Sequence, residues 1–385
     1  MQNYAPVAIV PCDTYDLDAV TNALNAALAA IDGLAWVTPG MRVVIKANLV
    51  TFLHPETAAT THPSVVCALT KLLVERGAVV TIGDSPGGTY GKAYLNRVYQ
   101  VCGMTQAVAF GAALNQDFST AKASYPEAMV MHEFEYTAFL DDADAIIDVC
   151  KLKSHGMMAL SAAAKNMFGV IPGTLKPEYH YRFPNSTDFA RMILDLNNFF
   201  KPRLSICDAI IGMEGNGPTM GTPKKIGCIL CSESPHALDL AGAHIINLPP
   251  ARVPTLTEAM SLGYIPEDIG GLTILGELES LRVADYKHVE QHNSVLFGGK
   301  VKGIPGYVIQ KVSTAALASK PVVLPKKCVG CAVCQKTCPA NAIKMKNKIP
   351  RFRRGRCILC FCCQEFCPKG ALVVKRPGIA RVFMR

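Results

Sequence analysis

The chain has 385 residues, more than the about 250–300 that one hydrophobic core supports, so we expect at least two domains. No uncharged apolar run reaches the roughly 18 residues of a membrane helix, and the first residues lack a secretory pattern. We therefore expect a cytoplasmic protein with no membrane partner. The net charge of +9 is concentrated in residues 320–385, which carry 16 basic side chains and one acid but no nucleic-acid motif. This pattern predicts no nucleic-acid partner.

In chain order, residues 1–311 alternate predicted strands with predicted helices. This alternation predicts an α/β body with a mostly parallel, helix-covered sheet. Residues 169–186 lack a regular pattern and are predicted to form a long loop, while residues 300–327 are predicted to connect the body to a small domain at 321–385. The predicted strands are 7–11, 42–46, 79–83, 145–150, 204–211 and 226–231. The predicted helices are 16–31, 64–76, 91–102, 157–168, 236–246 and 255–262.

The C-terminal domain contains one cysteine spacing twice. The motif C-x2-C-x2-C-x3-C-P begins at Cys328 and again at Cys357, so a shift of 29 residues superimposes the two copies. It resembles the motif of bacterial two-cluster ferredoxins, which implies two [4Fe–4S] clusters in a ferredoxin-like α+β module. Paired C-x2-C units also bind zinc, but a zinc site needs only two such pairs.

The same resemblance implies crossed ligation, in which the fourth cysteine of each motif binds the cluster of the other motif. Cys362 lies outside the pattern and is predicted to pack as a small apolar side chain. One implied ligand set is Cys328, Cys331, Cys334 and Cys367, and the other is Cys357, Cys360, Cys363 and Cys338.

Two further cysteines, Cys228 and Cys231, form a C-x2-C on a predicted strand. Residues three apart on a strand point to opposite faces, so we interpret this pair as core residues rather than ligands or a redox pair.

Basic and amide side chains gather at the ends of predicted strands and helices in the body, where open α/β sheets bind ligands. For any single lysine an ordinary surface position is the simpler interpretation, but the set predicts a pocket for a small anionic ligand. The spacing of two in Lys151, Lys153 and His155 places all three on one face if the strand continues. The catalytic candidates are Lys165, His155 and His180. The substrate-binding candidates are Lys46, Asn48, Lys151, Lys153, Asn166, Lys176, Glu214 and Asn216.

The stretch GDSPGG at 83–88 matches the G-x-S-x-G nucleophile elbow. The elbow needs a backbone N–H on the residue after the serine, and here that residue is Pro86, which has none. We therefore interpret the stretch as an anion-cradling loop or a plain turn.

Five stretches together resemble the iron–sulfur family known as domain of unknown function 362: PGMRVVIKANL, GDSPGG, CKLKSHGMMALSAAAKNMFGVIPG, DAIIGMEGNGP and the doubled cysteine motif. The resemblance spans about residues 5–310 and implies a cytoplasmic iron–sulfur protein of anaerobic type, without implying a reaction. In a second resemblance, Lys165, Pro172-Gly173 and His180 follow the order of the nickel-pincer lactate racemases, which hold their cofactor with such a Lys and His. Here SAAA replaces the Gly-Gly that precedes the lysine in that family.

Three functions are compatible with these features. The chain is predicted to be a reductase that passes electrons from the two clusters to an anion in the body, with a flavin or other organic cofactor as a further possibility. The alternatives are a non-catalytic electron carrier and a redox-neutral enzyme with an organometallic cofactor. Since the cysteine-rich domain is strongly basic, an acidic ferredoxin or flavodoxin is the expected electron donor.

Overall fold

A nine-stranded sheet forms the centre of residues 4–289, which together with residues 320–375 are described by the computed structural model. The strand order is β11-β1-β10-β9-β7-β2-β3-β4, and β8 pairs with β7 off this path. Five pairings between these strands are parallel and three are antiparallel, which confirms the predicted α/β class with a mostly parallel sheet. The strands are β1 (Val7–Pro11), β2 (Arg42–Ala47), β3 (Val79–Gly83), β4 (Ala113–Leu114), β7 (Ala145–His155), β8 (Ala159–Ser161), β9 (Leu204–Glu214), β10 (Thr222–Ser232) and β11 (Ile274–Gly276).

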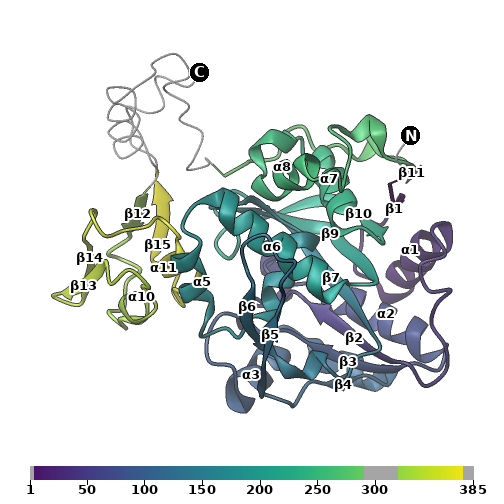
Figure 1. The fold of residues 1–385 in the computed structure, drawn as a ribbon, viewed down its shortest axis with the longest axis horizontal. Coiled ribbons are helices and arrows are strands. Elements are labelled where there is room, and N and C mark those ends of the chain that lie inside the picture. Colours follow the sequence, from purple (N-terminus) through teal and green to yellow (C-terminus); the bar gives the residue numbers. More distant parts are fainter. Residues whose placement is uncertain (1–3, 290–319, 376–385) are drawn as a thin grey trace.

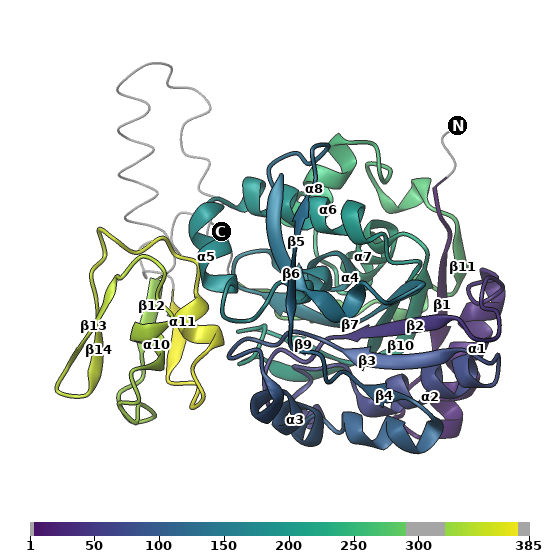
Figure 2. The same ribbon diagram turned by 60° about the horizontal axis from the view of Figure 1, so that its bottom comes forward.

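Helices cover both faces of this sheet (Figures 1 and 2). The apolar sides of α1 and α2 pack on one face, and those of α6, α7 and α8 lie over the other with the β5–β6 hairpin. The helices of the body are α1 (Leu17–Ala30), α2 (Pro63–Val74), α3 (Lys92–Val101), α4 (Ala163–Asn166), α5 (Lys176–Arg182), α6 (Ser186–Phe200), α7 (Pro235–Ile245) and α8 (Pro254–Ser261). The hairpin consists of β5 (Thr120–Ser124) and β6 (Glu133–Thr137).

The central strands are buried on both faces, as parallel strands under helices are. Every residue of β7 is buried. On β10, Cys228 packs in the apolar cluster that contains α7, whereas Cys231 packs in the cluster that contains α1 and α2. The predicted core positions of these two cysteines, on opposite faces of one strand, are therefore confirmed.

The largest difference from the predicted elements lies at residues 145–168. The predicted strand does not end at Cys150 but continues to His155 and turns back into β8, so most of the predicted helix 157–168 is absent and only the four residues of α4 are α-helical. The backbone pairing of β7 with β8 overrides the helical propensity of the alanines and methionines. The predicted loop at 169–186 contains α5, and α6 follows it.

The C-terminal module repeats one small unit. Strand β12 (Lys320–Val323) pairs with β15 (Leu372–Lys375), and β13 (Ile343–Lys346) pairs with β14 (Ile349–Phe352). The helices α10 (Val333–Lys336) and α11 (Cys362–Glu365) begin 29 residues apart, and each follows a residue with left-handed backbone, Ala332 or Phe361. The repeat in the sequence is therefore a repeat in the structure. The predicted connector lies mostly outside the described residues.

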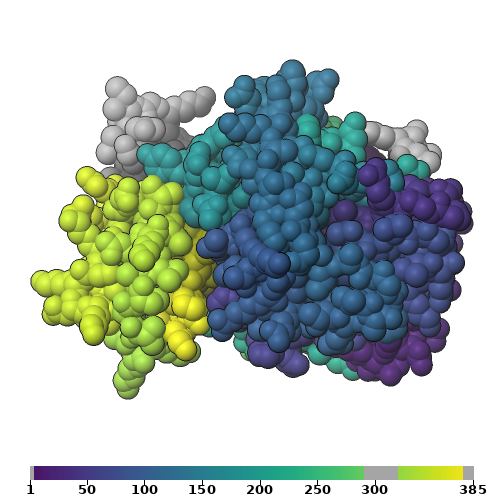
Figure 3. Space-filling model, turned by 90° about the horizontal axis from the view of Figure 1, so that it is seen from below, coloured from purple at the N-terminus to yellow at the C-terminus, as the bar shows by residue number. Residues whose placement is uncertain are grey.

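The module packs against the body through α11, and the β13–β14 hairpin lies at its far end (Figures 1–3). Gln364 Nε2 donates to the Asn216 carbonyl at 3.2 Å, and the ring of Phe366 lies over Gly87. Among the described helices, none is both long and apolar enough to cross a membrane.

Candidate functional site

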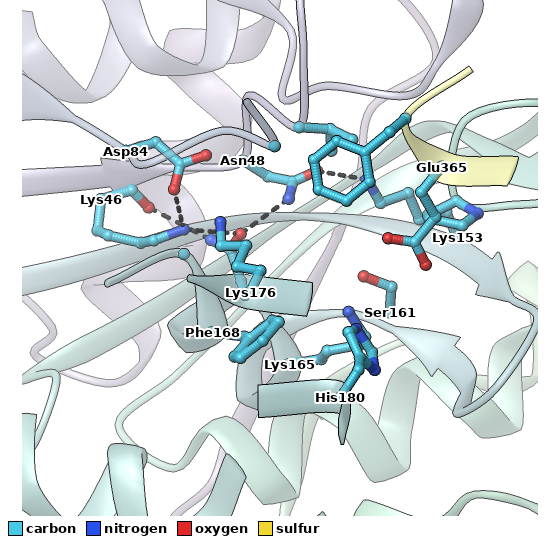
Figure 4. A pocket seen from close by; sticks show the side chains of 16 residues that line it. Lys46, Asn48, Asp84, Lys153, Ser161, Lys165, Phe168, Lys176, His180 and Glu365 are labelled. Atoms are coloured by element: carbon cyan, nitrogen blue, oxygen red, sulfur yellow. Dashed lines mark hydrogen bonds and ion pairs between the residues drawn. The ribbon is translucent and has the colours of Figure 1, made fainter. Parts of the chain in front are cut away.

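A polar pocket, here called the lysine pocket, lies where β2, β3 and β7 end (Figure 4). Because these strands run parallel, their carboxyl ends meet at one edge of the sheet, the usual ligand position in open α/β folds. The cavity has a volume of about 80 Å³. Its lining residues are Lys46, Asn48, Val50, Asp84, Gly87, Lys153, Ser161, Lys165, Asn166, Phe168, Gly169, Lys176, His180, Pro218, Glu365 and Phe366.

An amide and ion-pair network fixes one wall of the pocket. The buried ammonium of Lys46 lies 2.8 Å from Asp84 Oδ1, and Asp84 Oδ2 accepts from the Leu49 N–H. Asn166 Oδ1 accepts from Lys46 at 3.0 Å and from Asn48 Nδ2 at 2.9 Å. Because Asp84 compensates the charge of Lys46, this lysine is not available to pair with an anionic ligand. The network instead holds the side chains of Asn48 and Asn166 in position.

Lys153 contributes a cation without a carboxylate partner. Its ammonium donates to Asn48 Oδ1 at 2.5 Å and to the Ala59 carbonyl at 2.6 Å, and no ion pair to it occurs among the described residues. Burial, with smaller contributions from the charges of Lys165 and Lys151, lowers the pKa of Lys153 well below its usual value.

Lys165 and His180 supply groups that face the pocket with free polar atoms. In the described part of the chain, the Lys165 ammonium has no hydrogen bond or ion pair, and burial lowers its pKa against the opposing charge of Glu365. The His180 ring stacks on Phe189 with centroids 4.5 Å apart, and its buried Nδ1 has no hydrogen-bond partner. Burial lowers the pKa of His180 to about 3, so the ring is neutral at pH 7.

Lys176 approaches the pocket from α5. Its ammonium donates to the Ser85 carbonyl, and the Gly173 N–H donates to Ser85 Oγ at 2.8 Å. Burial is the main reason that the pKa of Lys176 is lowered to about 7. The Ser85 hydroxyl thus holds a backbone turn, in keeping with our rejection of a nucleophile elbow at GDSPGG.

The C-terminal module closes the pocket with Glu365 and Phe366. Glu365 Oε1 lies 3.3 Å from His155 Nε2, and the other ring nitrogen of His155 accepts from the Met157 and Met158 N–H groups. Burial acts to raise the pKa of Glu365, but the hydrogen bond from His155 and the nearby charges outweigh it and lower this pKa to about 2. Burial lowers the pKa of His155 to about 4, so a neutral imidazole faces an ionised carboxylate at pH 7.

Seven of the residues chosen from the sequence line this one pocket, and His155 lies behind Glu365 at its edge. The seven are Lys46, Asn48, Lys153, Lys165, Asn166, Lys176 and His180.

Three other residues chosen from the sequence lie outside the lysine pocket. Lys151 lies two residues back along β7, about 7 Å from Lys153, and its ammonium is paired with Asp208 at 2.8 Å. Glu214 accepts from the Lys287 N–H at 2.9 Å, and Asn216 contacts the module only through its carbonyl. None of these three side chains lines the lysine pocket.

Nine lining residues were not chosen from the sequence, and four of these carry polar or aromatic side chains of interest: Asp84, Ser161, Phe168 and Glu365. Two of them carried a usable signal, since Asp84 lies within GDSPGG and Glu365 is the single acid among residues 320–385. Ser161 and Phe168 lie in the region where the predicted helix was wrong, and no pattern marked them.

The cysteines of the two motifs come together across the repeat. Cys328, Cys331 and Cys334 line one cavity with Cys367, the last cysteine of the other motif. Burial, together with the nearby charges of Cys360 and Cys338, raises the pKa of Cys357, so Cys338 belongs spatially to the second motif. Among the described residues no three His, Cys, Asp or Glu side chains converge on a single metal ion. The cavity lined by four cysteines nevertheless fits a [4Fe–4S] cluster, which is larger than a single ion and takes cysteine thiolates as ligands.

Cys362 is buried beside Cys360. Its burial agrees with the prediction that it packs as a small side chain.

Comparison with known sequences agrees with this arrangement. Residues 320–368 match a 4Fe–4S dicluster domain, so the chain is an iron–sulfur protein of ferredoxin type at its C-terminal end. Residues 43–244 match the domain of unknown function DUF362, and the chain belongs to this family. It is 31% identical over 264 residues to a thylakoid-associated protein of Synechocystis sp., covering 68% of this chain and 80% of that protein. The resemblances to the domain of unknown function 362 and to the two-cluster ferredoxins are thereby confirmed.

Two solved structures match part of the chain. The lactate racemase apoprotein from Thermoanaerobacterium thermosaccharolyticum matches with a TM-score of 0.39 and 12% identity, over 63% of this chain and 56% of that one. A protein from Thermotoga maritima matches with a TM-score of 0.34 and 12% identity, over 53% of this chain and 52% of that one. The chain thus spans little more than half of each.

We predict that Gly169→Ala disrupts the wall of the lysine pocket. A Cβ at this position would lie 2.2 Å from Asp84 Oδ1 and 2.3 Å from Lys46 Nζ, so the side chains of this buried ion pair must shift. Weakening a buried pair destabilises the fold, and the thermal midpoint of the anaerobically purified protein should fall. Gly91→Ala is the control, because a Cβ there meets nothing within 4 Å. Equal midpoints for the two variants would contradict the described packing.

Proposed function

We propose that this chain is an anaerobic reductase that passes single electrons from two [4Fe–4S] clusters to a small anionic substrate or cofactor in the lysine pocket. One observation carries the proposal: Glu365, which closes the pocket, lies two residues from Cys363 and two from Cys367. These cysteines are the proposed ligands of different clusters. The short segment from Cys363 in α11 to Cys367 just beyond it therefore joins the pocket to a proposed ligand of each cluster.

The residues of the pocket would have distinct roles. Lys165 would bind the anion, because its ammonium has no partner among the described residues. Lys176 and His180 are candidate proton donors or acceptors, since the pKa of Lys176, lowered to about 7, allows both protonation states near neutral pH. The clusters would supply electrons one at a time. We also propose a cytoplasmic location, where reducing conditions preserve thiolate ligands.

We propose that the clusters have crossed ligands, and we predict about eight irons and eight acid-labile sulfides per chain. Cys338→Ala should remove the cluster whose other ligands are Cys357, Cys360 and Cys363, and should spare the one built on Cys328. Iron content should fall by about half, with loss of one of two signals in electron paramagnetic resonance. Cys362→Ala is the control and should keep both clusters. Loss of the cluster at Cys328 in the Cys338 variant would show local rather than crossed ligation.

The reductase function is tested by measuring whether a ligand in the lysine pocket changes the reduction potential of the clusters. We predict that acetate lowers the reduction potential of the clusters by tens of millivolts, because a bound anion opposes an added electron. Coulomb's law gives this size for a unit charge about 10 Å away at an effective dielectric constant of about 20. Lys165→Met should abolish the shift, whereas Lys122→Met, which removes an exposed lysine of β5, should not. An electron carrier without a ligand site would show the same potential with and without acetate.

A redox-neutral enzyme with an organometallic cofactor is the second candidate. It is favoured by Lys165 and His180, which line the same pocket and follow the order of the nickel-pincer racemases. Metal analysis and the visible spectrum of the anaerobic protein separate the possibilities. Nickel would support this candidate, a flavin spectrum would support the reductase, and iron–sulfur absorption alone would leave the potential measurement to decide.

The electron donor is proposed to be an acidic ferredoxin or flavodoxin that docks at the β13–β14 hairpin. Seven basic side chains of this region are exposed, and none forms an ion pair within the described residues: Lys344, Lys346, Lys348, Arg351, Arg353, Arg354 and Arg356. Lys344 lies directly opposite Arg351, an arrangement of like charges that destabilises a hairpin unless a partner compensates it. The hairpin also lies on the side of the module away from the body, so it is free to meet a separate protein (Figures 1 and 2).

We predict that reduction of the clusters by an acidic ferredoxin slows several-fold as ionic strength rises past about 0.1 M, where the Debye length is roughly 10 Å. Replacing Arg351, Arg353, Arg354 and Arg356 together by Gln should remove most of this salt dependence. Lys71→Gln and Lys92→Gln, on the body, serve as controls. A salt dependence that persists in the four-arginine variant would place the docking site elsewhere.

A further inference from the structure

A second cavity, here called the interdomain cleft, separates the body from the C-terminal module. Its volume is about 1020 Å³, far larger than that of the lysine pocket. The two cavities share Gly87, Glu365 and Phe366 in their walls, so the cleft adjoins the pocket on the side that the module closes. The space-filling view shows the module and the body meeting along one border (Figure 3). A ligand in the pocket therefore has room to extend outward between the two domains.

The walls of the cleft are mainly apolar. Phe52, Tyr94 and Tyr181 contribute aromatic rings from the body, and Phe366 contributes one from the module. Tyr181 is 57% exposed, so its ring is accessible to a ligand in the cleft. Pockets for organic ligands are typically lined in this way, with a few polar groups that fix orientation.

The cleft also reaches both proposed clusters. Cys338 and Cys367 line it, and these are the two cysteines that cross between the motifs. Each is the proposed ligand of a different cluster, so an organic group in the cleft lies against both.

The charge of the combined cavity favours an anion at its inner end. Lys165 faces the pocket without a carboxylate partner among the described residues, and His180 adds a buried ring nitrogen without a hydrogen bond. Lys336 and Lys369 lie at the cleft with exposed side chains, where they attract anions from solution. The cavity is thus polar and basic inside and apolar farther out.

We propose that the pocket and the cleft together bind one amphipathic organic anion. Its carboxylate lies at Lys165, and its apolar, ring-containing part lies in the interdomain cleft against Cys338 and Cys367. This inference rests on the proposed function and names its substrate class. In this arrangement the lysine pocket holds the carboxylate of the ligand, and the cleft holds the ring-containing part that receives electrons from the clusters.

The test compares acetate, benzoate and 2-naphthoate as ligands of the anaerobic, full-length holoprotein. Binding of 2-naphthoate is followed by its fluorescence, and the other two are measured by competition with it. Affinity should rise about tenfold or more with each added ring, because each ring buries apolar surface. Lys165→Met should weaken all three carboxylates by a similar factor, since all share the anionic head.

Tyr181→Ser isolates the contribution of the cleft. It should weaken 2-naphthoate about fivefold or more and leave acetate unchanged, because this side chain lines the cleft but not the pocket. Tyr264→Ser, which alters another exposed tyrosine of the body, is the matched control and should change neither affinity. Cluster absorbance and the thermal midpoint of each variant confirm that it is folded and loaded.

The outcomes separate this inference from the function on which it rests. Equal affinities for the three carboxylates would contradict ligand binding in the cleft. The same holds if Tyr181→Ser and Tyr264→Ser have equal effects on 2-naphthoate. If acetate binding still depended on Lys165, anion binding in the lysine pocket would remain supported. Binding that is independent of Lys165 for every carboxylate would overturn the proposed function as well.

Discussion

The contact between Glu365 and His155 organises the molecule, because it brings the single acid of residues 320–385 into the basic pocket of the body. A carboxylate with only 18% of its side chain exposed is stable only where hydrogen bonds and opposite charges compensate its desolvation. The ring of His155 and the charge of Lys165 contribute to that compensation, and the pKa of Glu365 is lowered to about 2. The module is therefore held in one orientation, with α11 toward the body and the basic hairpin away from it.

This contact leaves the lysine pocket with more cations than carboxylates. Lys46 is paired with Asp84, and Glu365 faces His155, but Lys153 and Lys165 have no ion pair of their own among the described residues. Burial lowers the pKa values of Lys153, Lys165 and Lys176 in this crowded site. A bound anion would relieve the repulsion between these cations and raise the same pKa values, so ligand binding and proton uptake are coupled.

The sequence sufficed for features that depend on local patterns. The strand–helix alternation predicted the sheet, and the spacing of the cysteines predicted a repeat that the backbone follows at Ala332 and Phe361. Residues at strand ends converge because parallel strands end at one edge, which is why Lys46 of β2 and Lys153 of β7 line the same pocket. The features that the sequence did not predict depend on contacts between residues distant in sequence. The β7–β8 pairing replaces most of a predicted helix, Lys151 forms an ion pair with Asp208, and Glu365 of the C-terminal module lines a pocket of the body.

The arrangement of the pocket has a consequence for how electrons and protons move together. Reduction adds negative charge to clusters whose proposed ligands, Cys363 and Cys367, flank Glu365. That charge favours the protonated form of nearby lysines, and Lys176, with its pKa at about 7, is in the range where a small change alters its protonation. In the proposed reductase, the cluster charge would fall after electron transfer to the substrate, and the lysine would then release its proton more readily. The proton would thus be delivered at the step at which the reduced substrate takes one up.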